Sequence, residues 1–165
     1  MEIKVLRATK DQAPILANLF EFYAYDFSEF SALKTGPDGR FGYEPLALYW
    51  TEANRFPFLV RVEDDLAGFV LVQQGSQVSG AGDIWDVAEF FILRAYRRQG
   101  VGERVAHDVF RKFTGRWEVR VADNNLVAQA FWSRVISAFT EVPTEPVITE
   151  VAGKRWHVFS IISSE

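Results

Sequence analysis

Alternation of apolar and polar residues marks most of the strands that the sequence predicts. A period of two is typical of strands with one buried face, and turn residues bound each run. The segment 85–93 ends in Phe90-Phe91-Ile92-Leu93, which is apolar on both faces, so we expect this strand in the centre of a sheet. The predicted strands cover residues 2–9, 58–62, 67–72, 85–93, 117–121, 147–151 and 156–162.

A helical period separates several of these strands. Val101, Val105, Val109 and Phe113 recur at the spacing of one helix face, with charged residues between them. The predicted helices cover residues 12–24, 44–53, 101–114 and 126–139. Strands interleaved with helices, without a repeat or a linker, predict one α/β domain over residues 1–165.

The composition of the chain excludes several classes of function. The chain has 165 residues, 48% of them hydrophobic, and a net charge of −4, which does not suit a nucleic-acid surface. It has no cysteine and two histidines, which excludes disulfides and a catalytic thiol and speaks against a metal centre. No apolar run approaches the ~20 residues of a membrane span, and the N-terminus lacks a signal-peptide pattern. We therefore expect a cytosolic protein that binds no metal and no membrane.

A short basic turn joins the central strand to the helix that follows it. It reads Arg97-Arg98-Gln99-Gly100-Val101-Gly102. A helix N-terminus presents unpaired N–H groups and a partial positive charge, which attract phosphate. Glycines at 100 and 102 would let phosphate oxygens approach the backbone, and Arg97 and Arg98 can add charge-assisted contacts. A tight turn flanked by solvated arginines is the alternative interpretation.

Two common phosphate-binding motifs do not fit this stretch. The dinucleotide fingerprint requires a third glycine where the chain has Val105, and neither glycine-rich segment contains the Gly-Lys-Ser/Thr of a Walker loop. The stretch instead resembles the pyrophosphate loop of the GCN5-related N-acetyltransferase (GNAT) superfamily, Gln/Arg-x-x-Gly-x-Gly/Ala. Tyr96, the pattern Asn125-x-x-Ala128-x-x-Phe131-Trp132 and the order of the elements extend the resemblance. Residues 131–136 resemble uncharacterised predicted acetyltransferases of that superfamily.

The resemblance implies an acyl-CoA N-acyltransferase fold, with a twisted, mixed, mostly antiparallel sheet of about seven strands flanked by about four helices. It also implies acetyl-CoA as cosubstrate and a primary amine of a small molecule or peptide as acceptor, and it is compatible with a homodimer. In the superfamily the central strand diverges from its neighbour and pairs with pantetheine, which points here to Phe91, Ile92 and Leu93. Asn125 would contact the pantetheine arm, with a plain helix cap as the alternative. The pyrophosphate would be held by the backbone amides of Arg98, Gln99, Gly100, Val101, Gly102 and Glu103.

Glu89 is the candidate general base. An alkyl amine with a pKa near 10.4 is protonated at pH 7, and its neutral form costs about 4–5 kcal/mol there. Glu89 interrupts an apolar strand just before the pantetheine-pairing segment, where burial would raise its pKa; a structural carboxylate is the alternative. Asp86 lies three residues earlier and is expected on the opposite face of the strand. Trp132 stands where many relatives have a tyrosine acid, and indole does not deliver a proton, so no acid is assigned.

Two functions follow from these residues. The first is direct transfer of an acetyl group to an amine in a ternary complex, since no cysteine can form an acyl-enzyme. The alternative is a non-catalytic acyl-CoA-binding regulatory or sensor domain, which Trp132 favours. The end of the first predicted helix falls where this fold builds the acceptor pocket, with core and surface roles as the alternative; the residues concerned are Tyr23, Tyr25, Asp26 and Glu29.

Overall fold

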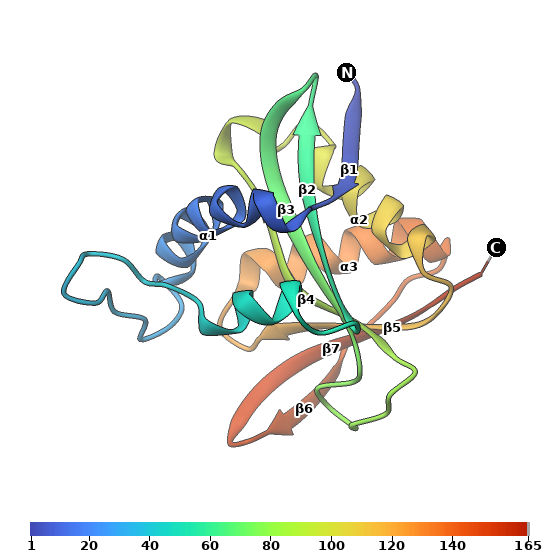
Figure 1. The fold of residues 1–165 in the computed structure, drawn as a ribbon. Helices are drawn as coiled ribbons and strands as arrows, with labels where there is room; N and C mark the ends of the chain where they lie inside the picture. The colour runs from blue at the N-terminus through green and yellow to red at the C-terminus, as the bar shows by residue number, and fades with distance from the viewer. Residues whose placement is uncertain (165) are drawn as a thin grey trace.

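A seven-stranded sheet forms the centre of the computed structural model, which describes residues 1–164 (Figure 1). The strand order is β1-β2-β3-β4-β5-β7-β6, and each neighbouring pair is antiparallel except β4 and β5. The predicted mixed, mostly antiparallel sheet of the acyl-CoA N-acyltransferase fold is confirmed. The strands are β1 (Ile3–Arg7), β2 (Arg55–Val62), β3 (Asp65–Gln74), β4 (Trp85–Ile92), β5 (Gly115–Ala122), β6 (Val147–Val151) and β7 (Lys154–Ser163).

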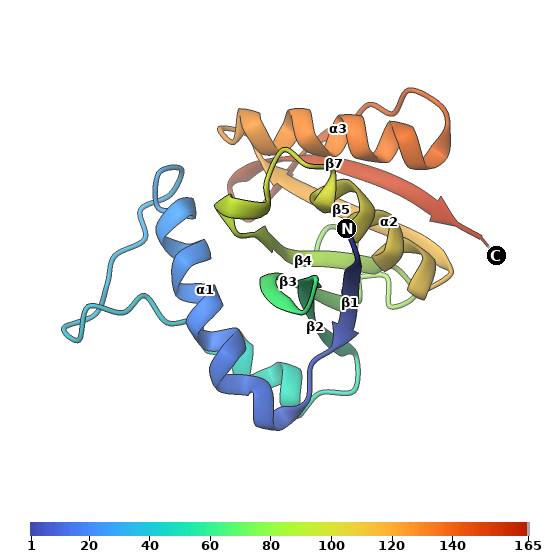
Figure 2. The same ribbon diagram turned by 90° about the horizontal axis from the view of Figure 1, so that it is seen from above.

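Helices cover both faces of this sheet (Figure 2). α1 (Ala13–Phe27) and the 3-10 helix η2 (Glu44–Trp50) pack on one face, and α2 (Val101–Lys112) and α3 (Leu126–Thr140) on the other. η2 stands where the sequence predicts a short helix over 44–53. Two shorter 3-10 segments, η1 (Lys10–Gln12) and η3 (Arg94–Tyr96), complete the helices of the described chain. Within residues 1–164 no helix has both the length and the apolar character needed to cross a membrane.

Each face of the sheet buries its own core. The α2 stripe predicted from the sequence is buried at Val101, Val105 and Val109 against β5 residues such as Trp117. The opposite core forms where α1 packs on the central strands, with the fully buried Phe69 among its members. Because side chains alternate along a strand, the polar positions of β5 point toward the α1 side. This arrangement places the charged side chains of β5 on the side of the sheet that carries α1.

A β-bulge interrupts the pairing of β3 with β4. Leu71 pairs with Glu89, but the next residue of β3, Val72, pairs with Val87, which leaves Ala88 as the extra residue. Side chains on β4 therefore do not alternate regularly across this point. Before the bulge Trp85 and Val87 face the α2–α3 core, and after it Phe90 and Ile92 do.

The bulge brings two carboxylates of β4 to the same side of the sheet. Glu89 contacts Tyr23 of α1, and Asp86 contacts Arg120, which projects from β5 toward the α1 side. The expectation that Asp86 lies on the face opposite Glu89 is therefore wrong. A separation of three residues predicts opposite faces only for a regular strand, and the extra residue at Ala88 shifts the alternation by one.

Candidate active site

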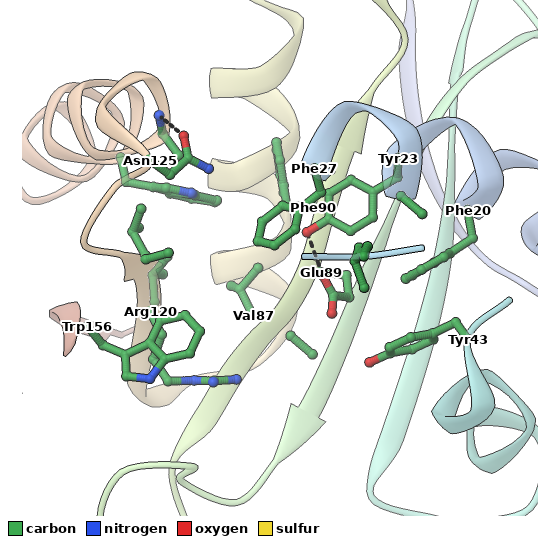
Figure 3. Close-up of a pocket in the computed structure, with 18 of the residues that line it drawn as sticks. Phe20, Tyr23, Phe27, Tyr43, Val87, Glu89, Phe90, Arg120, Asn125 and Trp156 are labelled. Atoms are coloured by element: carbon green, nitrogen blue, oxygen red, sulfur yellow. Dashed lines mark hydrogen bonds between the residues drawn. The ribbon is translucent and has the colours of Figure 1, made fainter. Parts of the chain in front are cut away.

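A cavity opens where β4 and β5 diverge. The two parallel strands pair only through Trp85 with Trp117 and Asp86 with Glu118. The residues that follow on each strand line a cavity of about 360 Å³, closed on its other sides by α1, the loop before η2, the first turns of α3 and Trp156 of β7. Figure 3 shows most of the side chains that form its wall. The divergence expected at the end of the central strand is present in the structure.

Glu89 lies in the wall of this cavity. The hydroxyl of Tyr23 donates a hydrogen bond to its Oε2 at 2.5 Å (Figure 3). Burial raises the pKa of Glu89 from an ordinary 4.5 to about 7, although the hydroxyls of Tyr23 and Tyr43 and the charge of Arg120 lower it. A carboxyl group with a pKa near 7 is ionised in part of the molecules at neutral pH and can accept a proton there.

The two tyrosines beside Glu89 remain protonated. Burial first, and then the negative charge of Glu89, raise the pKa of Tyr23 well above its ordinary 10. The same two causes raise the pKa of Tyr43. Ring contacts with Phe20 fix both tyrosines, at 5.3 Å edge-on for Tyr23 and 4.2 Å stacked for Tyr43. The Tyr23 phenol therefore serves as the hydrogen-bond donor that orients the carboxylate, and neither phenol is a base.

Asp86 is the second carboxylate of this region, and its surroundings differ from those of Glu89. It is fully buried, with 0% of the residue exposed. Arg120 donates from Nε to Oδ1 and from Nη2 to Oδ2, both at 3.1 Å, and Gln73 donates to Oδ2 at 2.8 Å. Since its oxygens face an arginine and an amide, Asp86 is a structural ion-pair partner, and Glu89 is the carboxylate that faces the cavity.

Arg97 of the basic turn, and Arg94 just before it, form hydrogen bonds within the protein. Asp26 accepts from Arg97 at 2.6 Å and from Arg94 at 2.5 Å, and Arg97 also donates from Nε to the carbonyl of Ile92 at 2.7 Å. Burial tends to raise the pKa of Asp26, but these two arginines lower it overall. Arg98 is exposed and has a left-handed φ of 60°. The side chain of Arg97 thus connects α1 to the turn.

The backbone of the turn and the start of α2 form an open cradle. Gly100 is the N-cap of α2 and has a φ of 79°, a conformation that favours glycine. The N–H groups of residues 98–103 have no backbone partner in a turn or cap within the described chain, and the first turn of a helix leaves its N–H groups free. Gln99 is exposed and its side chain donates to the carbonyl of Ala95. Val101 is buried, and Glu103 belongs to the first turn of α2.

Gly102 has a packing role. A Cβ atom at this position would lie 3.0 Å from Cε2 of Phe131, so the missing side chain lets α3 approach α2. At Gly100, in contrast, nothing lies within 4 Å of the position that a Cβ atom would take. Glycine is therefore required at the two positions for different reasons. Gly100 adopts a backbone conformation that favours glycine, and Gly102 leaves room for the ring of Phe131.

The end of β4 exposes fewer backbone groups than the sequence predicts. The N–H of Leu93 donates to the carbonyl of Ala67 in β3 at 2.8 Å. The carbonyl of Phe91 also faces β3, 2.0 Å from where a Cβ on Gly68 would lie. Alternation then turns the backbone of Ile92 toward the diverging side, where its carbonyl accepts from Arg97. Of the three predicted residues, only Ile92 directs its backbone away from β3.

Asn125 and Trp132 line the cavity from α3. Asn125 is the N-cap of the helix, because its Oδ1 accepts from the N–H of Ala128 at 3.1 Å. Trp132 is 6% exposed and packs edge-on against Phe90, with ring centroids 4.9 Å apart. Capping leaves the amide group of Asn125 free to donate into the cavity.

Of the other residues predicted at the end of α1, one lines the cavity and two lie on the protein surface. Tyr23 lines the cavity, whereas Tyr25 is 69% exposed and Glu29 is also exposed. The sequence reasoning missed Tyr43 and Arg120. The alternation Trp117-Glu-Val-Arg-Val121 already placed Arg120 opposite the buried positions of β5, but Tyr43 lies in an irregular loop without a pattern.

Comparisons with known proteins agree with the fold and with the turn motif. The sequence model of the acetyltransferase (GNAT) family matches residues 19–136. No curated protein matches the sequence. A crystal structure of an acetyltransferase from Thermus thermophilus superposes with a TM-score of 0.70 at 16% identity, covering 98% of this chain and 97% of that one.

Two further similar structures contain coenzyme A. PaiA N-acetyltransferase from Thermoplasma acidophilum in complex with coenzyme A has a TM-score of 0.64 at 9% identity, covering 98% of this chain and 99% of that one. Spermidine N-acetyltransferase from Vibrio cholerae in complex with CoA and spermine has a TM-score of 0.63 at 12% identity, covering 98% and 95%. At these identities the likeness shows the fold alone.

Proposed function

The chain belongs to the acetyltransferase (GNAT) family, and we propose that it is an N-acetyltransferase that moves an acetyl group from acetyl-CoA to a primary amine in one ternary complex. The observation that carries the proposal is Glu89, a carboxyl group with a pKa raised to about 7 in the wall of the cavity between β4 and β5. This group has the protonation behaviour that a base for an ammonium acceptor requires.

The residues at the start of α2 fit the coenzyme. The N–H groups of residues 98–103 would hold the pyrophosphate, since they lack backbone partners and the open space over Gly100 admits a ligand. The backbone of Ile92, directed into the divergence of the strands, and the amide of Asn125 would contact the pantetheine arm. For Phe91 and Leu93 the proposal keeps only side-chain contacts, because β3 engages their backbone. Acetyl-CoA supplies the acetyl group as a thioester.

Glu89 would take the proton of the acceptor amine. At pH 7 an amine with a pKa of 10.4 lies about 4–5 kcal/mol from its neutral form, and a carboxylate with a pKa near 7 removes its proton far more easily than water does. Tyr23 holds one carboxylate oxygen by its hydrogen bond, which directs the other toward the cavity. The aromatic side chains around Glu89 reduce its contact with water, which raises the pKa.

The leaving thiol requires less help. A thiol with a pKa near 8.5 leaves as a thiolate at a cost of about 2 kcal/mol at pH 7. The buried Trp132 stands at the position of the usual tyrosine and provides no acidic proton. We therefore propose that solvent protonates the thiolate and that no side chain of the described cavity is required for that step.

A thiol-release assay tests the proposal. Purified protein is mixed with acetyl-CoA and a broad panel of primary amines, and free thiol is followed with a chromogenic disulfide. We expect amine-dependent release, and Glu89→Gln should lower kcat/KM by about 10²- to 10⁴-fold. Glu150→Gln, at an exposed position of β6, is the matched control and should behave like wild type. Full activity of Glu89→Gln would show that Glu89 is not the base.

The non-catalytic acyl-CoA sensor is the alternative, and Trp132 is the observation that favours it. It predicts saturable binding of acetyl-CoA by calorimetry together with no amine-dependent thiol release across the whole panel. The same two measurements therefore separate the alternatives, because both functions need the cradle at Gly100 and only the enzyme needs Glu89.

Four expectations from the sequence remain part of the proposal. They are an acceptor that is a small molecule or a peptide, no nucleic-acid partner, a cytosolic location, and a state that is monomeric or homodimeric. The net charge of −4 supports the second. Cell fractionation and analytical ultracentrifugation test the last two.

A further inference from the structure

Arg120 is held in one orientation within the cavity wall. Its Nε and Nη2 both donate to the fully buried Asp86, which Gln73 holds from the other side. The ring of Trp156, on the neighbouring strand β7, lies 5.4 Å from the guanidinium carbon. An arginine fixed by a bidentate pair and an aromatic face has lost most of its side-chain freedom before any ligand arrives.

The ion pair leaves the outer edge of the guanidinium free. Asp86 occupies the side defined by Nε and Nη2, so Nη1 and the second N–H of Nη2 point away from it. Within residues 1–164 Nη1 has no hydrogen-bond partner, and it is not among the buried atoms that lack one, so it is open to solvent. This edge presents two parallel N–H groups, the geometry that matches a carboxylate.

Arg120 and Glu89 are the charged residues that line the cavity among the described residues. They project from β5 and β4, the two strands that diverge, and Figure 3 shows them on either side of Val87. A polyamine would require several acidic groups along the cavity, and the lining offers one. A molecule with one amine and one carboxylate matches both charged groups.

We propose that the acceptor is a small amine that carries a carboxylate, such as an α-amino acid, and that Arg120 binds this carboxylate while Glu89 receives the amine. This inference rests on the proposed acetyl transfer and adds the chemical class of the acceptor. Aromatic side chains such as Phe27 and Phe90 line the cavity beside the two charges and would contact the apolar part of the acceptor.

Matched acceptors test the Arg120 site. Thiol release is measured for the twenty common L-amino acids and for their amides, which lack the carboxylate charge, and for spermidine. We expect the ratio of kcat/KM for the best amino acid to that for its amide to be about 10- to 100-fold higher in wild type than in a variant without Arg120, as for a hydrogen bond to a charged group. The two amines differ in their own pKa, so the deciding quantity is the change in this ratio between wild type and variants, from which the amine pKa cancels.

Arg120→Gln should lower this ratio by about 10- to 100-fold relative to wild type. Because this change leaves the buried Asp86 unpaired, the double variant Asp86→Asn with Arg120→Gln provides a neutral pair and should give the same ratio in a folded protein. Arg116→Gln, at an exposed position of the same strand, should keep the wild-type ratio.

The outcomes separate the two proposals. A double variant that keeps the wild-type ratio of amino acid to amide overturns the Arg120 site and leaves acetyl transfer standing. Wild type that acetylates spermidine as efficiently as the best amino acid does the same. An absence of thiol release with every amine overturns both.

Discussion

Replacing Glu89 with glutamine should change how the stability of the protein depends on pH. The pKa of Glu89 is raised by burial from 4.5 to about 7, so the folded protein holds a proton there over a range in which the unfolded chain has lost it. The stabilising contribution of this proton is complete below pH 4.5 and is lost as the pH rises through 7. Above that range the folded protein carries a buried negative charge, which glutamine would not carry.

The size of the effect follows from the pKa change. A rise from 4.5 to about 7, at about 1.4 kcal/mol per pH unit, corresponds to about 3.5 kcal/mol in total. Glutamine keeps an oxygen that can accept the hydrogen bond of Tyr23, so the comparison isolates the charge. The free energy of unfolding of wild type should therefore fall by about 3 kcal/mol relative to Glu89→Gln between about pH 4 and pH 8.

Urea unfolding at a series of pH values measures this difference. Other titrating groups are common to both proteins and cancel, and Glu150→Gln serves as a control that should show no pH-dependent difference. A difference between wild type and Glu89→Gln that stays constant across this pH range would refute the reasoning, since it would mean that Glu89 titrates alike in the folded and unfolded states.

The other predictions concern the hydroxyl beside Glu89 and the two glycines of the turn. Tyr23→Phe removes a hydrogen bond that lowers the pKa of Glu89, so the acidic limb of the pH profile of kcat/KM should move to higher pH, and a limb that stays in place would contradict this role. Gly100→Ala should lower the free energy of unfolding by about 1 kcal/mol because its φ is 79°, and Gly100→Asn should lower it less. Gly102→Ala should cost about 1–3 kcal/mol in urea unfolding by displacing Phe131, and the added change Phe131→Leu should recover part of that loss.

The elements with a clear period could be predicted from the sequence. The stripe Val101, Val105 and Val109 is buried as expected, and the doubly apolar end of β4 lies in the middle of the sheet. These patterns report burial, which a periodic sequence encodes directly. The helix predicted over 44–53 is present, but the sequence did not predict its type. Its seven helical residues form a 3-10 helix, and the apolar spacing of such a helix resembles that of an α-helix.

The relations between distant residues could not be predicted in the same way. The bulge at Ala88 depends on how β3 pairs with β4, and no residue type in β4 indicates it from the sequence. Asp26 and Arg97 are 71 residues apart in the sequence, so the basic turn alone could not predict their ion pair. The packing role of Gly102 could not be predicted either, since the side chain that it contacts, Phe131, belongs to another helix.

The bulge also explains how two carboxylates on one strand acquire different roles. With Asp86 and Glu89 on the same side of β4, the charge of Arg120 could have been shared between them, and the pKa of Glu89 would then have been lowered more strongly. Arg120 instead directs both Nε and Nη2 to Asp86, and Glu89 accepts a hydrogen bond from the hydroxyl of Tyr23. Because a neutral hydroxyl stabilises a carboxylate less than a guanidinium does, burial outweighs it and the pKa of Glu89 remains at about 7. The assignment of the base to Glu89 thus follows from which carboxylate the arginine pairs with, and that choice follows from the extra residue in β4.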